Sequence, residues 1–289
     1  MRRRFATLIL IVVSAAVAVG QQVTLPRLED STTMAVIGDS GTGGGDQYEL
    51  AKVLIAAHAQ FPFDFTIMLG DNMYGREGPD DFRKKFEQPY KPLLDAGVKF
   101  YASLGNHDDP TQINYKLFNM DGRRYYTFSR GPAQFFVLDS TYVDPAQLDW
   151  LERELQASRA RWKISYFHHP IYSSGARHGS EVDLRQLVEP LFIKHGVDVV
   201  FSGHEHFYER IHPQHGIYYF TSGAAAKLRR GNIRRTTLTA VGYDSDLSFM
   251  LVELTDDQMY FQTISRKGGT VDSGVIARPE DPADQTESR

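Results

Sequence analysis

Short apolar runs alternate with helix-like patterns along most of the chain. Runs of apolar and β-branched residues predict strands at 33–37, 63–69, 99–104, 162–167 and 197–201. Apolar positions at helical spacing predict helices at 47–60, 79–95, 145–158 and 182–195. Asp144, just before Pro145, is expected to cap the third of these helices, and Gly196 to end the fourth.

Other runs are strand-like and have no helix between them. The aromatic segments 124–128 and 134–138 flank Arg130-Gly-Pro and predict a hairpin. Further strands are expected at 217–221, 247–254, 259–265 and 271–276. The whole pattern predicts an α/β (α+β) domain over residues 30–278, in which antiparallel strands join the sheet of the alternating part.

The two ends of the chain differ from this pattern. At the N-terminus, three arginines precede an uncharged apolar run that ends in small residues, an order typical of a secretory signal. We therefore expect a signal peptide at residues 1–20 and a secreted or periplasmic protein without a stable membrane anchor, because the apolar run is short for a span. An uncleaved anchor is the alternative. Residues 279–289 are rich in Pro, Asp and Glu and are expected to be disordered.

Composition limits the chemistry that the chain can carry. It has 289 residues and no cysteine, which excludes disulfides, cysteine zinc sites and iron–sulfur clusters. Any metal site must therefore use carboxylate, imidazole, amide or phenol ligands. The formal net charge of −4 gives no indication of a nucleic-acid partner.

Polar residues follow five of the predicted strands directly. The clusters are Gly38-Asp-Ser-Gly, Gly70-Asp-Asn-Met-Tyr, Gly105-Asn-His-Asp, His168-His-Pro and Gly203-His-Glu-His. Ligands of open α/β sheets bind beyond the carboxyl ends of the strands, so we expect all five clusters to converge at one edge.

These clusters supply more metal donors than one ion needs. The seven candidate ligands are Asp39, Asp71, Tyr74, Asn106, His168, His204 and His206. A mononuclear zinc site takes three or four ligands, whereas this set with a shared carboxylate suits two metal ions. Asp71 is the natural bridge, and the neutral amide of Asn106 limits the negative charge that an anionic substrate would meet.

Together, the five ordered motifs resemble those of the metallophosphoesterase (calcineurin-like) superfamily. The motifs are GDxG, GDNxY, GNHD, HxP and GHxH, and the resemblance covers residues 33–276. Many members of the superfamily carry a histidine where this chain has Gly41. Purple acid phosphatases, including the small tartrate-resistant type, instead use a tyrosine three residues after the bridging aspartate, and Tyr74 stands there.

This resemblance implies a four-layer αββα sandwich with a dimetal site at the carboxyl ends of the strands. It implies a ferric ion held by Asp39, Asp71, Tyr74 and His206. It also implies a divalent ion (Fe, Zn or Mn) held by Asp71, Asn106, His168 and His204. By position, His107 resembles the histidine that assists the leaving group. His178 resembles a second histidine outside the metal ligands, although its spacing from Pro170 is one residue longer here.

The implied function is that of an exported acid phosphatase. Such an enzyme would hydrolyse small phosphate monoesters by attack of a metal-bound hydroxide. A phosphodiesterase or nucleotide-cleaving hydrolase of the same superfamily is the first alternative. A non-catalytic phosphate-binding protein and a site with two divalent ions and no iron are the others.

Each motif also has a structural interpretation when taken alone. Asp39 and Asp71 could cap helices, Tyr74 could pack under a loop, and His168 and His169 could be core histidines. The ordered occurrence of all five motifs at strand ends favours the metal site. The basic segment 227–235 could be either a solvated loop or a clamp for an anion.

Overall fold

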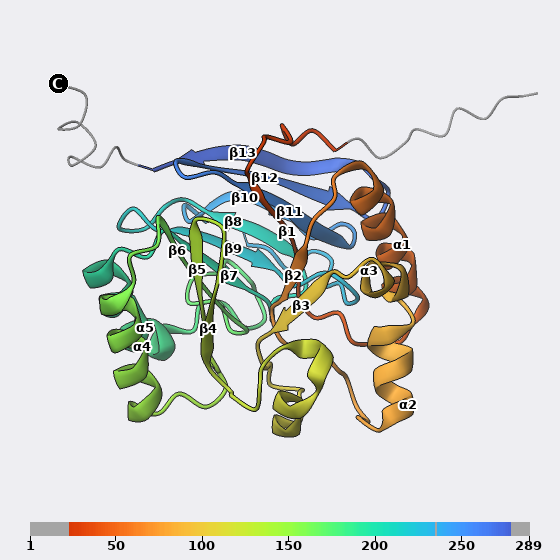
Figure 1. Cartoon of the computed structure of the whole chain (residues 1–289), viewed down its shortest axis with the longest axis horizontal. Coiled ribbons are helices and arrows are strands. Elements are labelled where there is room, and N and C mark those ends of the chain that lie inside the picture. The colour runs from red at the N-terminus through yellow and green to blue at the C-terminus, as the bar shows by residue number, and fades with distance from the viewer. Residues whose placement is uncertain (1–22, 235, 279–289) are drawn as a thin grey trace, which may run out of the picture.

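Two β-sheets lie face to face in the computed structural model of the chain, which describes residues 23–234 and 236–278 (Figure 1). In spatial order, the six-stranded sheet consists of β13 (Thr270–Ala277), β12 (Gln258–Ser265), β11 (Ser248–Leu254), β1 (Thr32–Ile37), β2 (Phe65–Met68) and β3 (Lys99–Ala102). Strands β1, β2 and β3 are parallel, and the three C-terminal strands continue the sheet in antiparallel fashion.

The second sheet has seven strands. Their spatial order is β10 (Thr239–Tyr243), β8 (Tyr208–Ile211), β9 (Tyr218–Ser222), β7 (Val199–Ser202), β6 (Trp162–Phe167), β5 (Ala133–Val137) and β4 (Tyr126–Arg130). Strands β5, β6, β7 and β9 are parallel, and β4 forms the expected hairpin with β5.

Helices cover the outer side of each sheet (Figure 1). On one side lie α1 (Gly45–Gln60), α2 (Pro79–Phe82) and α3 (Lys91–Asp95), and on the other α4 (Pro145–Ala157) and α5 (Val182–His195). Single turns of other helix types span Arg83–Glu87, Pro110–Asn114 and Lys116–Phe118. This arrangement confirms the predicted αββα sandwich.

Apolar packing holds the layers together. Between the sheets, Phe65 of β2 meets Phe135 of β5 edge to face, with ring centroids 5.6 Å apart and both side chains fully buried. A second core joins α4 and α5 to their sheet through residues such as Leu151, Val188 and Phe192. Because both sheets are fixed against each other, their parallel strands present their carboxyl ends to one shared edge.

Most predicted elements are confirmed within a few residues of their observed bounds. Asp144 caps α4 by accepting a hydrogen bond from the Gln147 N–H at 2.8 Å, and Gly196 ends α5 with a left-handed φ of 68°. The helical stretch predicted at 79–95 is divided in the structure. A turn follows residue 87, and α3 begins at Lys91 with Pro92 in its first turn.

Two strands were missed by the sequence prediction, β8 and β10. Strand β8 reads Tyr-Glu-Arg-Ile. Its two central residues are charged, so the sequence gives no indication that the strand is largely buried. Glu209 is fully buried and accepts hydrogen bonds from the Ser174 N–H (3.0 Å) and the Thr239 hydroxyl (2.6 Å), and Arg210 pairs with Asp272 at 2.7 Å. These partners are distant in sequence, so no local pattern marks the strand.

The predicted signal peptide at 1–20 and the predicted disordered tail at 279–289 lie outside the described residues. Within the part of the chain that the structure describes, no helix has the length and apolar character needed to cross a bilayer.

Candidate metal centre

The loops that follow β1, β2, β3, β6 and β7 meet at one edge of the sandwich. Backbone bonds tie them together: the Asp39 N–H donates to the Gly70 carbonyl at 3.1 Å, and the Gly203 N–H donates to the His168 carbonyl at 2.9 Å. All seven predicted ligands therefore fall within one small region, as the positions of the strand ends predicted.

Three of these residues have left-handed backbone conformations. Asp39, Asp71 and His204 have φ angles of 57°, 50° and 65°, in the left-handed region of backbone conformation that residues other than glycine rarely adopt. Such conformations cost free energy and persist where the surrounding structure imposes them, often at functional sites.

One group of donors consists of Asp39, Tyr74 and His206. The Tyr74 hydroxyl lies 3.0 Å from Asp39 Oδ1 and 3.4 Å from His206 Nε2, and that nitrogen lies 3.3 Å from the same carboxylate oxygen. Three donor atoms of different residue types thus face a common point.

A second group consists of Asp71, Asn106, His168 and His204. His168 Nε2 is 3.3 Å from Asp71 Oδ1, 3.1 Å from Asn106 Oδ1 and 3.1 Å from His204 Nδ1. Two metal–nitrogen bonds of about 2.0–2.1 Å at a tetrahedral angle place their nitrogens about 3.3 Å apart, close to the observed separation. The other ring nitrogen of His168 bonds to the Leu69 carbonyl at 2.8 Å, which fixes the ring.

The two groups are adjacent. Asp39, Asp71 and His168 offer ligand atoms that all lie within 4.8 Å of one another, and so do His168, His169 and His204. His169 is partly committed elsewhere, because its Nδ1 lies 2.9 Å from the Ser140 hydroxyl. This donor set of carboxylate, imidazole, amide and phenol fits two cations.

Burial sets the protonation of the cluster. It is the largest cause of the lowered pKa of His168, which lies well below its usual range, and of the pKa values of about 2 for His204 and about 3 for His206. These imidazoles are therefore neutral and keep a lone pair for a metal. Burial, and next the Asp71 carboxylate, raise the pKa of Asp39 well above its usual value. A bound cation would offset the free-energy cost of ionising Asp39.

The two predicted outer histidines lie next to different residues of the cluster. His107 is exposed; its N–H donates to Asp71 Oδ1 at 3.0 Å and its ring lies 4.9 Å from the Tyr74 ring. His178 is also exposed, and its ring lies 4.3 Å from that of His204. The structure thus brings both histidines next to the candidate ligands.

Three residues that support the site, the half-buried Asp108 and the buried Lys85 and Glu205, were not singled out from the sequence. Asp108 accepts hydrogen bonds from the N–H groups of Gly105 (2.7 Å) and Met73 (2.9 Å), and so joins the loops after β2 and β3. Glu205 accepts from the Gly179 N–H at 2.9 Å. Lys85 donates to the Tyr74 carbonyl at 2.9 Å. Asp108 ends the GNHD motif, which could have marked it, whereas the partners of Lys85 and Glu205 are visible only in the fold.

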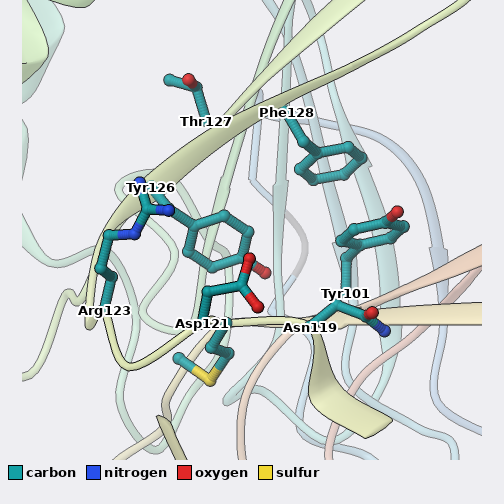
Figure 2. Close-up of a pocket in the computed structure, with 8 residues that line it drawn as sticks. Tyr101, Asn119, Asp121, Arg123, Tyr126, Thr127 and Phe128 are labelled. Carbon is teal, nitrogen blue, oxygen red and sulfur yellow. The ribbon is translucent and has the colours of Figure 1, made fainter. Parts of the chain in front are cut away.

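A pocket of about 920 Å³ opens beside the first donor group. His107 and His206 line it, together with the basic residues Arg177, Lys227, Arg229, Arg230 and Arg266. A smaller pocket of about 220 Å³ lies between the edge strands β3 and β4, where Figure 2 shows the stacked rings of Tyr101 and Phe128. None of the predicted site residues lines this second pocket.

Comparisons with known proteins agree with this geometry. The profile of the calcineurin-like phosphoesterase family matches residues 32–208, a span that includes all the predicted ligands and both outer histidines. Purple acid phosphatase 4 of Arabidopsis thaliana is 30% identical over 274 residues, which cover 81% of this chain and 80% of that protein.

Two solved structures share the fold. Purple acid phosphatase PPD1 from yellow lupin seeds superposes with a TM-score of 0.72 at 18% identity, over 88% of this chain and 55% of that chain. GAP50, described as the anchor in the inner membrane complex of Plasmodium, superposes with a TM-score of 0.75 at 20% identity. The superposition covers 87% of this chain and 90% of that chain. The family match and the similarity to the Arabidopsis protein establish that the chain belongs to the calcineurin-like phosphoesterases, a family of metal-dependent phosphoric ester hydrolases, and to their purple acid phosphatase type.

Proposed function

We propose that the chain is a dimetal acid phosphatase that hydrolyses small phosphate monoesters in the pocket beside His107 and His206. The observation that carries this proposal is the pair of adjacent donor groups, whose facing atoms are separated by 3.0–3.4 Å. Two ions at such a site would clamp both oxygens of an in-line displacement.

The ligands divide by chemistry. We assign Asp39, Asp71, Tyr74 and His206 to Fe(III), because carboxylate and phenolate oxygens suit a hard trivalent ion. Asp71, Asn106, His168 and His204 are assigned to a divalent partner: iron, zinc or manganese. When bound, the ions would supply Lewis acidity and lower the pKa of a coordinated water.

The packing around Gly41 supports Tyr74 as a ligand. A Cβ at Gly41 would lie 1.8 Å from the Asn72 carbonyl oxygen and 2.6 Å from the Met73 Cα, so no side chain fits there. The Tyr74 N–H instead donates to the Gly41 carbonyl at 2.9 Å, which brings the loop after β2 against the first motif. Without a histidine at this position, the Tyr74 phenol completes the first donor group.

His107 would act on the leaving group. Its backbone N–H is fixed on Asp71 Oδ1 at 3.0 Å, while its exposed ring faces the pocket. A protonated imidazole there can donate to the ester oxygen as it leaves. His178, whose ring lies next to that of His204, would be a second contact for the substrate.

The proposal also includes export from the cell. The predicted signal peptide at residues 1–20 supports a secreted or periplasmic enzyme without a stable membrane anchor. We propose no nucleic-acid partner.

The first test is turnover. The mature, metal-loaded chain is expected to hydrolyse an aryl phosphate monoester at acidic to neutral pH, and His204→Ala is expected to lose more than about 100-fold in kcat/KM, because it removes a metal ligand. Release of the phenol measures both rates. Absence of turnover by a chain with two bound ions contradicts the proposal. Faster cleavage of a matched diester would instead favour the phosphodiesterase.

A second test separates the role of His107 from metal binding. His107→Ala is expected to lower kcat by about 10²–10⁴-fold because it removes the proton donor. Its metal content, measured by elemental analysis, should stay at the wild-type level. Parallel loss of metal and activity would make His107 a ligand or a structural support.

A spectroscopic measurement tests whether Tyr74 binds Fe(III). The iron-loaded protein is expected to show a visible charge-transfer band from a tyrosinate to Fe(III), and Tyr74→Phe should abolish it because it removes the phenolate. Tyr90→Phe serves as the control, since this buried tyrosine is not among the candidate ligands. Persistence of the band in Tyr74→Phe would exclude Tyr74 as the iron ligand, and absence of any band would favour two divalent ions.

The steric role of Gly41 gives another prediction. Gly41→Ala is expected to destabilise the protein by about 1–3 kcal/mol through overpacking and to lower its metal content, because the added methyl displaces the Tyr74 loop. Gly45→Ala is the control, since a Cβ there meets nothing within 4 Å. Thermal unfolding and elemental analysis measure the two effects. Equal behaviour of the two variants would contradict the packing argument.

A further inference from the structure

The pocket beside His107 and His206 is larger and more basic than a single phosphate requires. Its cavity of about 920 Å³ is in the upper part of the range that protein pockets for whole small molecules occupy. Beyond the two histidines, Arg177, Lys227, Arg229 and Arg230 supply positive charge to its wall.

Three of these cations have no acidic partner among the described residues. Arg266, which also lines the pocket, is paired with Asp46, Glu49 and Asp246 at 2.5–3.1 Å. Arg229 lies 3.5 Å from Glu205. Over residues 23–234 and 236–278, by contrast, no carboxylate forms a salt bridge with Arg177, Lys227 or Arg230.

The basic segment is held in place from both sides. The Arg229 N–H donates to the His206 carbonyl at 3.0 Å, which joins the segment to the candidate metal ligands. Asn232 donates to the Glu205 carboxylate at 3.1 Å, and its carbonyl accepts from the Ala176 N–H at 2.7 Å. The loop that carries Arg177 and the loop that carries Arg229 and Arg230 are therefore fixed against each other.

Individual contacts orient two of these cations, Lys227 and Arg230. The Lys227 ammonium lies 3.5 Å from the centroid of the Tyr74 ring, so one positive charge stands directly over a candidate ligand. Arg230 donates to the Ser245 carbonyl, which leaves its charge without a counter-ion. Lys227 is half-buried, whereas Arg177 and Arg230 are exposed on the rim of the pocket, where an anion can reach both side chains.

We propose that this basic wall binds a second phosphate group of the substrate, so that the preferred substrates are small bisphosphorylated molecules. A phosphate carries close to two negative charges at neutral pH and offers three acceptor oxygens, which suits several cations better than a single carboxylate does. Guanidinium groups bind such oxygens in pairs. One phosphate would lie at the metal centre and the other against Arg177 and Arg230.

The proposal rests on the proposed phosphatase function, and its test uses ligands that cannot be hydrolysed. Binding of propane-1,3-bisphosphonate and propylphosphonate to the metal-loaded protein is measured by calorimetry at low salt. The bisphosphonate is expected to bind about tenfold more tightly, the size expected for two partly exposed ion pairs. The difference should shrink at high salt, because exposed charges are screened.

Two variants test whether the preference for the bisphosphonate arises at the basic wall. Arg177→Gln/Arg230→Gln is expected to abolish the tenfold preference. Lys52→Gln, which removes an exposed charge from α1, should keep it. A preference that survives in the double variant arises at the metal ions and overturns the proposal. Equal affinity of the wild type for the two ligands overturns it as well.

Turnover of an aryl phosphate is measured in parallel. Turnover without the bisphosphonate preference refutes the second phosphate site and leaves the phosphatase function intact. The preference without turnover supports the second phosphate site and refutes the phosphatase.

Discussion

The burial of two carboxylates beside each other is the constraint on which this site depends. Asp39 and Asp71 are almost fully inaccessible, and both lie in left-handed backbone. Burial and the Asp71 charge raise the pKa of Asp39, so the cluster without a cation resists ionisation. A multivalent ion removes that penalty, and the neutral, buried imidazoles around it are ready to share the coordination. The left-handed backbone at Asp39 and Asp71 therefore has a free-energy cost that directs two charged side chains to one point.

Two other acids, the half-buried Asp108 and the buried Glu205, hold the loops in place. Asp108 accepts bonds from two loops, and burial together with Asp71 raises its pKa to about 8. Glu205 lies between the two histidines of the last motif and accepts bonds from the His178 loop and from Asn232. These carboxylates do not face the cluster with the ligands. They fix the loops that carry His107, His178 and the basic wall, so that the positions of the groups at the site depend on one another.

The sequence predicted that the candidate ligands lie together because each of them is local to a strand end. Each candidate follows a short apolar run, and the parallel order of β1, β2 and β3 and of β6 and β7 brings those ends together. The missed features depend on contacts across the fold. Strand β8 contains Glu209 and Arg210, whose burial is possible only because β10, β13 and the loop after β6 supply partners. The pocket wall is similar: no local pattern shows that residue 177 lies near residues 229 and 230.

The similarity to GAP50 concerns the fold alone and not the function. That structure superposes on this chain at a TM-score of 0.75, and the protein is described as an anchor. A shared fold therefore does not by itself imply catalysis. What favours turnover here is the site. Two donor groups lie within contact of each other, a histidine is fixed on Asp71 but exposed to a pocket, and several cations on the wall of that pocket form no salt bridge with the described residues. A scaffold has no need for an open basic pocket that leads to strained, buried ligands. An enzyme needs each of these features, because it must attract an anion, hold it against metal ions and release its products.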